Sequence, residues 1–361
     1  MARKINFFAG PSVLPVEVLE ELGKEMVDFK GSGLSLVETS HRSATYDEVH
    51  MGALNLFREL LQVPDNYKIL FLQGGATLQF SMIPLNLMGQ GGTCDFVNSG
   101  AWAKKALADA KKIGNVNVVW DGKDSSYMTL PEAASVKPSA GSSYLHLTSN
   151  ETIGGVQWKE FPKTGDVPLV ADMSSDILCR PLNVNDFGLI YAGAQKNIGP
   201  SGLTVVIVRD DLIERHADEL TAYMAYKTHA EKDSLYNTPG VFPIWAMELV
   251  LKRMKSLGGL DAFEKMNQEK ADLLYNVISQ YSDFYNCPVD EKYRSVMNVV
   301  FTTPGEETDK AFVAQAAEKG MLGLKGHRSV GGCRASIYNS MTKEGVETLA
   351  SFMEDFAKAN S

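Results

Sequence analysis

One lysine lies in a segment of small residues that suits close approach to a ligand. The segment Tyr191-Ala-Gly-Ala-Gln-Lys196-Asn-Ile-Gly-Pro runs between two short apolar stretches. Glycine and alanine let the backbone approach another group closely, because their side chains are absent or small. A lysine amine becomes a nucleophile when burial or a nearby cation favours loss of its proton. Lys196 is therefore a candidate for forming a Schiff base.

A carboxylate ends another apolar stretch earlier in the chain. Val167-Pro-Leu-Val-Ala-Asp172 is an expected strand, and ligands of open α/β sheets bind beyond the carboxyl ends of strands. An Asp there can pair with the protonated pyridine nitrogen of pyridoxal phosphate (PLP) and keep its ring an effective electron sink. Alone, Asp172 could cap a turn and Lys196 could be a solvated charge. Together, in this glycine-rich setting, they favour a PLP enzyme.

Two turns before helical patterns suit the same cofactor. Gln73-Gly-Gly-Ala-Thr77 separates a strand from a helix, so free N–H groups and the helix dipole could receive a phosphate. A plain tight turn with Thr77 as N-cap explains that segment equally well. Gly100-Ala-Trp102 also starts a helix after a strand. Trp102 could stack on a flat heteroaromatic ring, although a tryptophan is more often core or interface filling.

The apolar pattern predicts how these residues are positioned. Short apolar runs alternate with helical patterns up to about Phe242, which is typical of crossover units around a mostly parallel sheet. The expected strands are 68–72, 95–98, 116–120, 143–147, 167–171, 189–192 and 203–208, and the expected helices are 78–88, bent by Pro84, and 102–113.

The pattern changes after Phe242 to long amphipathic helices at 244–257 and 260–280. The strand 297–302, a helix over 309–319, the strand 334–338 and a final helix from Lys343 follow in an order that resembles a small α+β domain. We predict a large domain over residues 16–260 and a small domain made of residues 1–15 and 261–361, with the boundary uncertain by about ten residues.

Bulk composition excludes several classes of protein. The 361 residues carry a net charge of −9, which argues against general nucleic-acid binding. No run of roughly 18 apolar residues predicts a membrane span, and the N-terminus lacks the features of a signal peptide. The four cysteines are widely spaced, with no CxxC pair and no metal-ligand spacing. This usage fits a reducing cytoplasm and predicts neither a disulfide framework nor a metal site.

Several longer motifs identify a family. The lysine segment occurs with Ala-Asp-Met-Ser-Ser, Asn-Glu-Thr-Ile, Tyr-Asn-Thr-Pro and Gly-His-Arg-Ser-Val-Gly-Gly-Cys-Arg-Ala-Ser-Ile-Tyr-Asn, and the opening Asn6-Phe-Phe-Ala-Gly-Pro11 and Glu38-Thr-Ser-His-Arg42 fit too. Together they resemble the phosphoserine aminotransferases, from about residue 5 to the C-terminus. The resemblance implies a fold-type I PLP-dependent transferase, with a mostly parallel seven-stranded sheet, flanking helices and a smaller C-terminal domain. It also implies a homodimer with shared active sites.

The resemblance assigns a role to each site residue. Lys196 would carry PLP and shuttle protons, Asp172 would hold the pyridine nitrogen, Trp102 would stack on the ring and Thr152 would contact the cofactor near its hydroxyl. The cofactor phosphate would be bound by Ala76, Thr77 and Gln195, with Asn237 and Thr238 from the partner chain. The substrate would be held by Arg334 at its α-carboxylate and by His41, Arg42, His327 and Arg328 at its distal anion. Some family members have Gly-Arg in place of Ala76-Thr77, so a phosphate contact here rests on backbone N–H groups and a hydroxyl.

The implied reaction moves an amino group between L-glutamate and 3-phosphonooxypyruvate, giving O-phospho-L-serine and 2-oxoglutarate in serine biosynthesis. A related four-carbon substrate of pyridoxine biosynthesis is a second expectation. The distal pocket must accept a carboxylate or a phosphate, and the arginine fork suits both. We hypothesise that His41 and His327 adjust the charge as the phosphate replaces the carboxylate.

Other readings of the same residues remain at this point. Arg42 and Arg328 could be ordinary surface charges, and Cys333 is better explained as a small residue packed beside Arg334 than as a nucleophile. A cysteine desulfurase or an alanine–glyoxylate type aminotransferase would stay within PLP chemistry. A nucleotide-binding or scaffolding protein would use the Gly-Gly turn for a phosphate and leave Lys196 merely charged.

Overall fold

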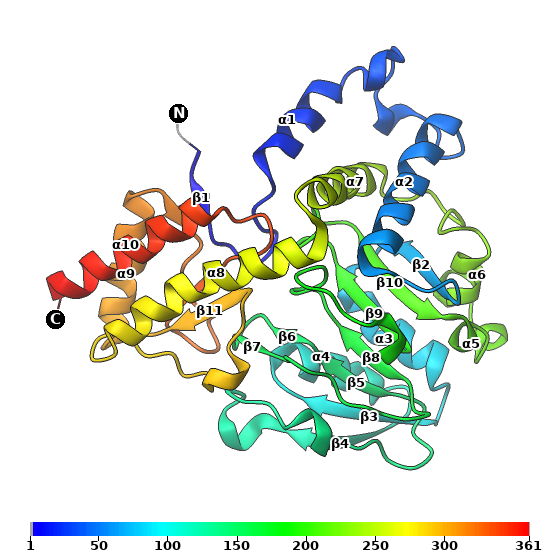
Figure 1. Cartoon of the computed structure of the whole chain (residues 1–361). Helices are drawn as coiled ribbons and strands as arrows, with labels where there is room; N and C mark the ends of the chain where they lie inside the picture. Colours follow the sequence, from blue (N-terminus) through cyan, green and yellow to red (C-terminus); the bar gives the residue numbers. More distant parts are fainter. Residues whose placement is uncertain (1–2, 361) are drawn as a thin grey trace.

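A twisted seven-stranded sheet forms the centre of the molecule, as a computed structural model of the chain shows (Figure 1). The structure describes residues 3–360. Its strands are short and almost wholly buried, apart from the edge strand β4, and they are β2 (Tyr67–Leu72), β3 (Thr93–Asn98), β4 (Asn115–Asp121), β5 (Leu145–Thr148), β8 (Leu169–Asp172), β9 (Leu189–Gly193) and β10 (Thr204–Arg209).

The strands lie in the order β2-β10-β9-β8-β5-β3-β4. Only β10 runs against its neighbours: it pairs antiparallel with both β2 and β9, and the remaining pairs are parallel. The carboxyl ends of β2, β3, β5, β8 and β9 therefore all face the same edge of the sheet, where ligands of α/β proteins bind.

Helices cover both faces of this sheet. Alternation along β2 sends Ile69 and Phe71 to one face, and Leu70 and Leu72 to the other. The first face packs against α2 (Ala44–Leu61) and α7 (Val241–Ser256). The second face packs against α3 (Gly75–Leu87), α4 (Ala101–Ala110), α5 (Asp210–Ile213) and α6 (Tyr226–Ala230). Before α2, α1 (Val16–Glu25) packs on α7.

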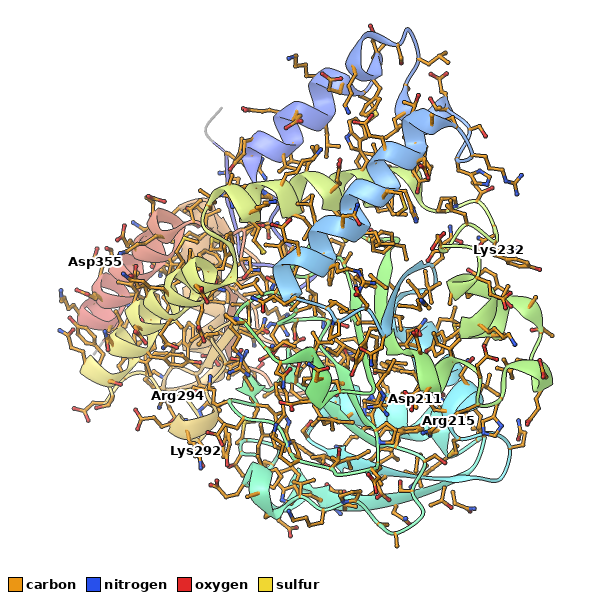
Figure 2. All side chains as sticks on the ribbon, turned by 45° about the vertical axis from the view of Figure 1, so that its right-hand side comes forward. Asp211, Arg215, Lys232, Lys292, Arg294 and Asp355 are labelled. Atoms are coloured by element: carbon orange, nitrogen blue, oxygen red, sulfur yellow. The ribbon has the colours of Figure 1, made fainter. Side chains whose placement is uncertain are left out.

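A separate apolar core lies among the C-terminal elements, on the left in Figure 1. It is enclosed by α8 (Gly259–Gln280), α9 (Glu306–Glu318) and α10 (Lys343–Asn360) with the antiparallel pair β11 (Asn298–Phe301) and β13 (Cys333–Ser336). The N-terminal strand β1 (Ile5–Asn6) pairs parallel with β12 (Met321–Leu322) beside it. Charged side chains such as Lys292 and Asp355 lie on the outside (Figure 2).

The expected fold is confirmed. All seven strands expected before Phe242 form one mostly parallel sheet. Most helix and strand ends lie within about three residues of their expected positions. Pro84 lies inside α3, where Asn86 donates to the Met82 carbonyl at 2.8 Å. The domain boundary stays a prediction: Leu260 and Phe263 of α8 pack in the large core, whereas Ala271 onward packs in the second core. Within residues 3–360, no helix is both long and apolar enough to cross a membrane.

Candidate active site

The sheet edge gathers the expected cofactor residues from separate parts of the chain. Asp172 is the last residue of β8, Lys196 follows β9, and Trp102 lies in the first turn of α4 after β3. Thr152 follows the short strand β6 (Asn150–Glu151), which pairs with β7 (Val156–Gln157) just after β5. The strand order places these four residues at neighbouring carboxyl ends, because β3, β5, β8 and β9 are adjacent in the sheet.

Lys196 is held between a hydroxyl and an aromatic face. Its Nζ donates to the Thr152 Oγ1 at 2.7 Å and lies 4.7 Å from the centre of the Trp102 ring. Burial lowers the pKa of Lys196, Arg334 lowers it further, and the carboxylates of Asp172 and Glu151 raise it. The net direction is downward, which favours the neutral amine that a nucleophile and proton carrier needs.

The Asp172 carboxylate is fixed by a buried hydrogen-bond network. Its Oδ1 accepts from the Ser174 N–H at 2.9 Å and the Ser174 hydroxyl at 2.6 Å, and the side chain is 4% exposed. Burial raises the pKa of Asp172, while Lys196, Ser174 and a hydrogen bond from Tyr191 lower it. Tyr191 is in turn 2.9 Å from the His146 Nε2. The carboxylate is therefore oriented before any ligand arrives.

The expected phosphate loop has free donors at a helix start. Gly74 is the N-cap of α3 in a left-handed conformation, with φ of 89°, and Gly75 follows with φ of 66°. Thr77 consequently lies inside the first turn, and the alternative in which it caps the helix is wrong. A first helical turn leaves N–H groups unpaired, including those of Ala76 and Thr77. An anion can bind there.

Residues 237 and 238 lie beside this loop in the same chain. The Asn237 side-chain amide donates to the Gln73 Oε1 at 3.3 Å, and the Gln73 amide donates to the Thr238 carbonyl at 3.3 Å. Gln195 immediately precedes Lys196, and its backbone carbonyl accepts from the Ser12 N–H at 3.0 Å. The contacts tie the N-terminal segment and the 237–238 loop to the sheet edge.

A cationic group from the C-terminal part lies near Lys196. Arg334 of β13 donates to the Thr152 carbonyl at 3.3 Å, and its buried Nε has no partner among residues 3–360. Burial and the charges of Arg334, Arg328 and Lys105 lower the pKa of His327. The Arg334 guanidinium therefore has an N–H donor available for an anionic substrate, and Arg328 and Lys105 add positive charge nearby.

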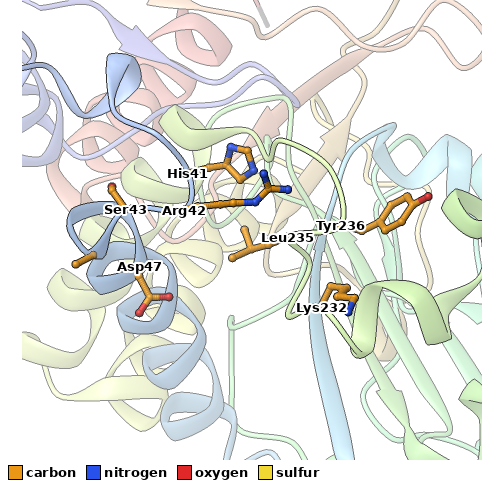
Figure 3. A pocket seen from close by; sticks show the side chains of 8 residues that line it. His41, Arg42, Ser43, Asp47, Lys232, Leu235 and Tyr236 are labelled. Atoms are coloured by element: carbon orange, nitrogen blue, oxygen red, sulfur yellow. The ribbon is translucent and has the colours of Figure 1, made fainter.

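His41 and Arg42 line a cavity whose lining residues do not include Lys196. They line a cavity of about 630 Å³ at the start of α2, together with Lys232 and Tyr236 (Figure 3). Lys196 is not among its lining residues, and the His41 Nε2 is buried with no partner among the described residues. Tyr236 of this cavity directly precedes Asn237, whose side chain contacts Gln73.

The residues present fit PLP. A partly buried lysine amine beside a fully buried carboxylate suits an aldehyde and a pyridine nitrogen, and the Trp102 ring suits stacking. Buried polar atoms around them, including the Trp102 Nε1, the Thr148 hydroxyl and the Arg334 Nε, have no partner within residues 3–360. No group of three or more His, Cys, Asp or Glu side chains in this range could hold a metal ion.

Comparisons with known proteins agree with this site. The class-V aminotransferase family matches residues 5–349. The phosphoserine aminotransferase of Geobacillus kaustophilus is 52% identical over 358 residues, and that of Halalkalibacterium halodurans is 50% identical over 356 residues, each match covering 99% of both chains. The solved structure of phosphoserine aminotransferase from Bacillus circulans subsp. alkalophilus is 49% identical, covers 99% of both chains and has a TM-score of 0.98.

This chain belongs to the phosphoserine aminotransferases. It is therefore a PLP-dependent class-V aminotransferase of serine biosynthesis, and the scaffolding alternative is wrong. A PLP-bound phosphoserine aminotransferase from Trichomonas vaginalis is 36% identical, covers 98% of this chain and 100% of its own, and has a TM-score of 0.89. Cys333 is 1% exposed and burial raises the pKa of its thiol, so this aminotransferase uses it as a packing residue.

Sequence reasoning missed several residues of the network. Ser174 and Tyr191 orient Asp172, and Glu151 accepts hydrogen bonds from the N–H groups of Trp102 and Ala103. Ser174, Tyr191 and Glu151 all stand inside the motifs Ala-Asp-Met-Ser-Ser, Tyr-Ala-Gly-Ala-Gln-Lys and Asn-Glu-Thr-Ile that identify the family. Polar residues within such motifs were the available signal, but their partners come from other strands and so required the fold.

Proposed function

We propose that Lys196 is the covalent anchor of PLP and that Asp172, Trp102 and Thr152 hold the ring, with Ala76, Thr77 and Gln195 at its phosphate. The observation that carries this proposal is the placement of the Lys196 amine, 2.7 Å from the Thr152 hydroxyl and 4.7 Å from the centre of the Trp102 ring. PLP, when bound, supplies an electron-accepting ring that eases loss of the Cα proton. The side chains of this protein move the proton and orient the substrates.

The proton moves through the lysine amine. With the cofactor bound, the Lys196 Nζ would take the proton from the substrate Cα and later give a proton back to carbon, so the amine would end each half-reaction in the protonation state in which it began. The Thr152 hydroxyl, 2.7 Å away, fixes the position of that amine. The lowered pKa of Lys196 favours its neutral amine. The Asp172 carboxyl would face the ring nitrogen; burial raises its pKa, and Lys196 and Ser174 offset part of that rise.

Guanidinium groups orient the substrates. Arg334 binds the α-carboxylate, since its side chain already reaches the Thr152 carbonyl and its Nε is free among the described residues. His327 and Arg328 bind the distal anion, which is the γ-carboxylate of L-glutamate or the phosphate of 3-phosphonooxypyruvate. The products of one full cycle are 2-oxoglutarate and O-phospho-L-serine.

A homodimer completes the site in this proposal. His41 and Arg42 line a cavity that does not include Lys196, and the adjacent Tyr236 leads to Asn237 and Thr238. We infer that this edge of one chain supplies the distal-anion and phosphate contacts of its partner.

The four cysteines are unpaired, which supports a reducing cytoplasm as the place of action. Amination of the four-carbon substrate of pyridoxine biosynthesis stays a prediction.

The anchor can be tested by spectroscopy and assay. The purified protein with PLP should absorb visible light, lose that band on borohydride treatment, and retain a mass increase on the peptide that contains Lys196. Lys196→Ala should lack the modified peptide and lose activity with phosphoserine and 2-oxoglutarate by more than about a thousandfold. Lys292→Ala, at an exposed lysine, should behave as wild type. An unmodified Lys196 after saturation with PLP contradicts the proposal.

A further inference from the structure

The carboxylate of Glu151, which has no role in the proposed reaction, is buried at the start of α4. Glu151 is 1% exposed, and both of its oxygens accept hydrogen bonds from this helix start. Its Oε2 accepts from the Trp102 N–H at 3.1 Å. Its Oε1 accepts from the Ala103 N–H at 3.0 Å and from the Ser99 hydroxyl at 3.4 Å. The carboxylate thereby satisfies N–H groups that have no partner inside the helix.

The local sequence leaves room for this carboxylate. The N-cap of α4 is Gly100, which has no side chain to cap the helix itself. A Cβ atom at Gly100 would lie only 2.6 Å from the Glu151 Cδ, closer than real contacts allow. Glycine at this position therefore admits a cap that comes from β6, a different element, in place of a cap from the helix's own sequence.

The Trp102 ring depends on this cap for its polar anchoring. Its Nε1 is buried and has no hydrogen-bond partner within residues 3–360, so the indole does not fix its own position through that atom. The Trp102 N–H, in contrast, is bound by Glu151. The next residue after Glu151 is Thr152, which accepts from the Lys196 Nζ at 2.7 Å. Neighbouring residues thus hold the amine and the ring that faces it.

We propose that Glu151 is a positioning residue of the aminotransferase site, fixing the first turn of α4 so that the Trp102 ring stays over Lys196. This inference rests on the proposed function, because it presupposes that the cofactor stacks on Trp102. Glu151 acts through the helix start and touches neither substrate nor cofactor. Two of its three hydrogen-bond partners are backbone N–H groups, which can only donate, and the third is the Ser99 hydroxyl.

Burial has the largest effect on Glu151 and raises its pKa. The N–H groups of Ala103 and Trp102 and the charge of Lys196 favour the charged carboxylate and offset part of that rise. In the other direction, Glu151 and Asp172 both raise the pKa of Lys196 against the effect of burial. Loss of the Glu151 charge should therefore lower the pKa of the Lys196 amine as well as loosen the helix start.

The test compares two neutralised buried carboxylates. Glu151→Gln keeps the shape but turns an amide NH₂ toward an N–H donor. In the chain without PLP, amide hydrogen exchange at Trp102 and Ala103 should then be about tenfold faster, and PLP should dissociate about tenfold more readily. Glu248→Gln is the matched control, since Glu248 is 5% exposed and bonded to the Lys252 Nζ at 2.7 Å on α7. It should leave both quantities unchanged.

Two further variants separate the possible failures. Gly100→Ala keeps Glu151 but displaces its carboxylate, and it should speed exchange at the same two amides even if the Gln variant folds poorly. Trp102→Leu removes the aromatic ring and reports how much the ring contributes to PLP binding. Wild-type exchange at Trp102 and Ala103 in both Glu151→Gln and Gly100→Ala would overturn the positioning role. Unchanged PLP binding in Trp102→Leu would instead contradict the stacking on which the proposed function relies.

Discussion

His327 lies where a change of charge would matter to an anionic substrate. Burial and the neighbouring cations lower its pKa, so the free site holds a neutral imidazole at neutral pH. The Ser329 N–H donates to the His327 Nδ1 at 3.2 Å, which leaves the proton of the neutral ring on Nε2. The Ser329 hydroxyl, 2.7 Å from the same Nδ1, can accept when the ring becomes fully protonated. The ring can thus serve a carboxylate or a phosphate.

We predict a pH dependence from this residue. A bound dianion favours the imidazolium and raises the pKa of His327, so affinity for the phosphorylated substrate should strengthen as pH falls toward the pKa of the free site. His327→Asn should flatten the ratio of phosphoserine to glutamate affinity between pH 9 and pH 6 by about threefold to tenfold. The ratio should be measured for wild type, His327→Asn and the double variant with His41→Asn. A double variant whose ratio varies with pH as strongly as that of wild type would refute charge adjustment by these histidines.

At the scale of elements, a buried lysine joins α8 to the loop that follows β13. Lys270 is 3% exposed, and its Nζ donates to the carbonyls of Ile337, Tyr338 and Met341 at 3.0, 2.8 and 3.1 Å. Lys270→Met keeps the volume but leaves three buried carbonyls without this donor. We expect it to lower the free energy of unfolding by about 3 kcal/mol.

Chemical denaturation would measure this loss. Lys265→Met, at an exposed position on the same helix, is the control and should change stability by less than about 0.5 kcal/mol. Because this loop continues from the strand that carries Arg334, the Lys270 variant should also raise the KM for glutamate more than it lowers kcat. A Lys270→Met protein as stable as the control would show that the loop finds other donors.

The sequence predicted the elements that have a strong local pattern. Buried strands such as Leu189–Gly193 stand out as short continuous apolar runs, and the helix Gly259–Gln280 stands out because its apolar residues recur at the helical period. The apolar pattern could not predict that β10 runs antiparallel, because the direction of a strand depends on its connection and not on its apolar content. The same holds for the site: the types and order of Asp172 and Lys196 were readable, but the partners that orient them come from non-adjacent strands.

At the scale of the whole molecule, the cavity that His41 and Arg42 line without Lys196 leads to a prediction about two chains. The cavity at the start of α2 has a buried His41 nitrogen without a partner among residues 3–360, and a guanidinium, which suit an anion, yet Lys196, the proposed catalytic amine, does not line it. If each active site takes Arg42 from the partner, then defects in Lys196 and Arg42 on different chains should complement one another.

Complementation should be measured by mixing the two inactive proteins. In a heterodimer of Lys196→Ala and Arg42→Ala chains, one site then contains both defects and the other contains neither. Random exchange of equal amounts should restore about a quarter of wild-type activity, because half the dimers are mixed and each has one intact site. The double variant Arg42→Ala/Lys196→Ala mixed with Arg42→Ala is the control and should stay inactive. If Arg42 served its own chain's site, every site in the first mixture would keep a defect, and subunit exchange would recover nothing.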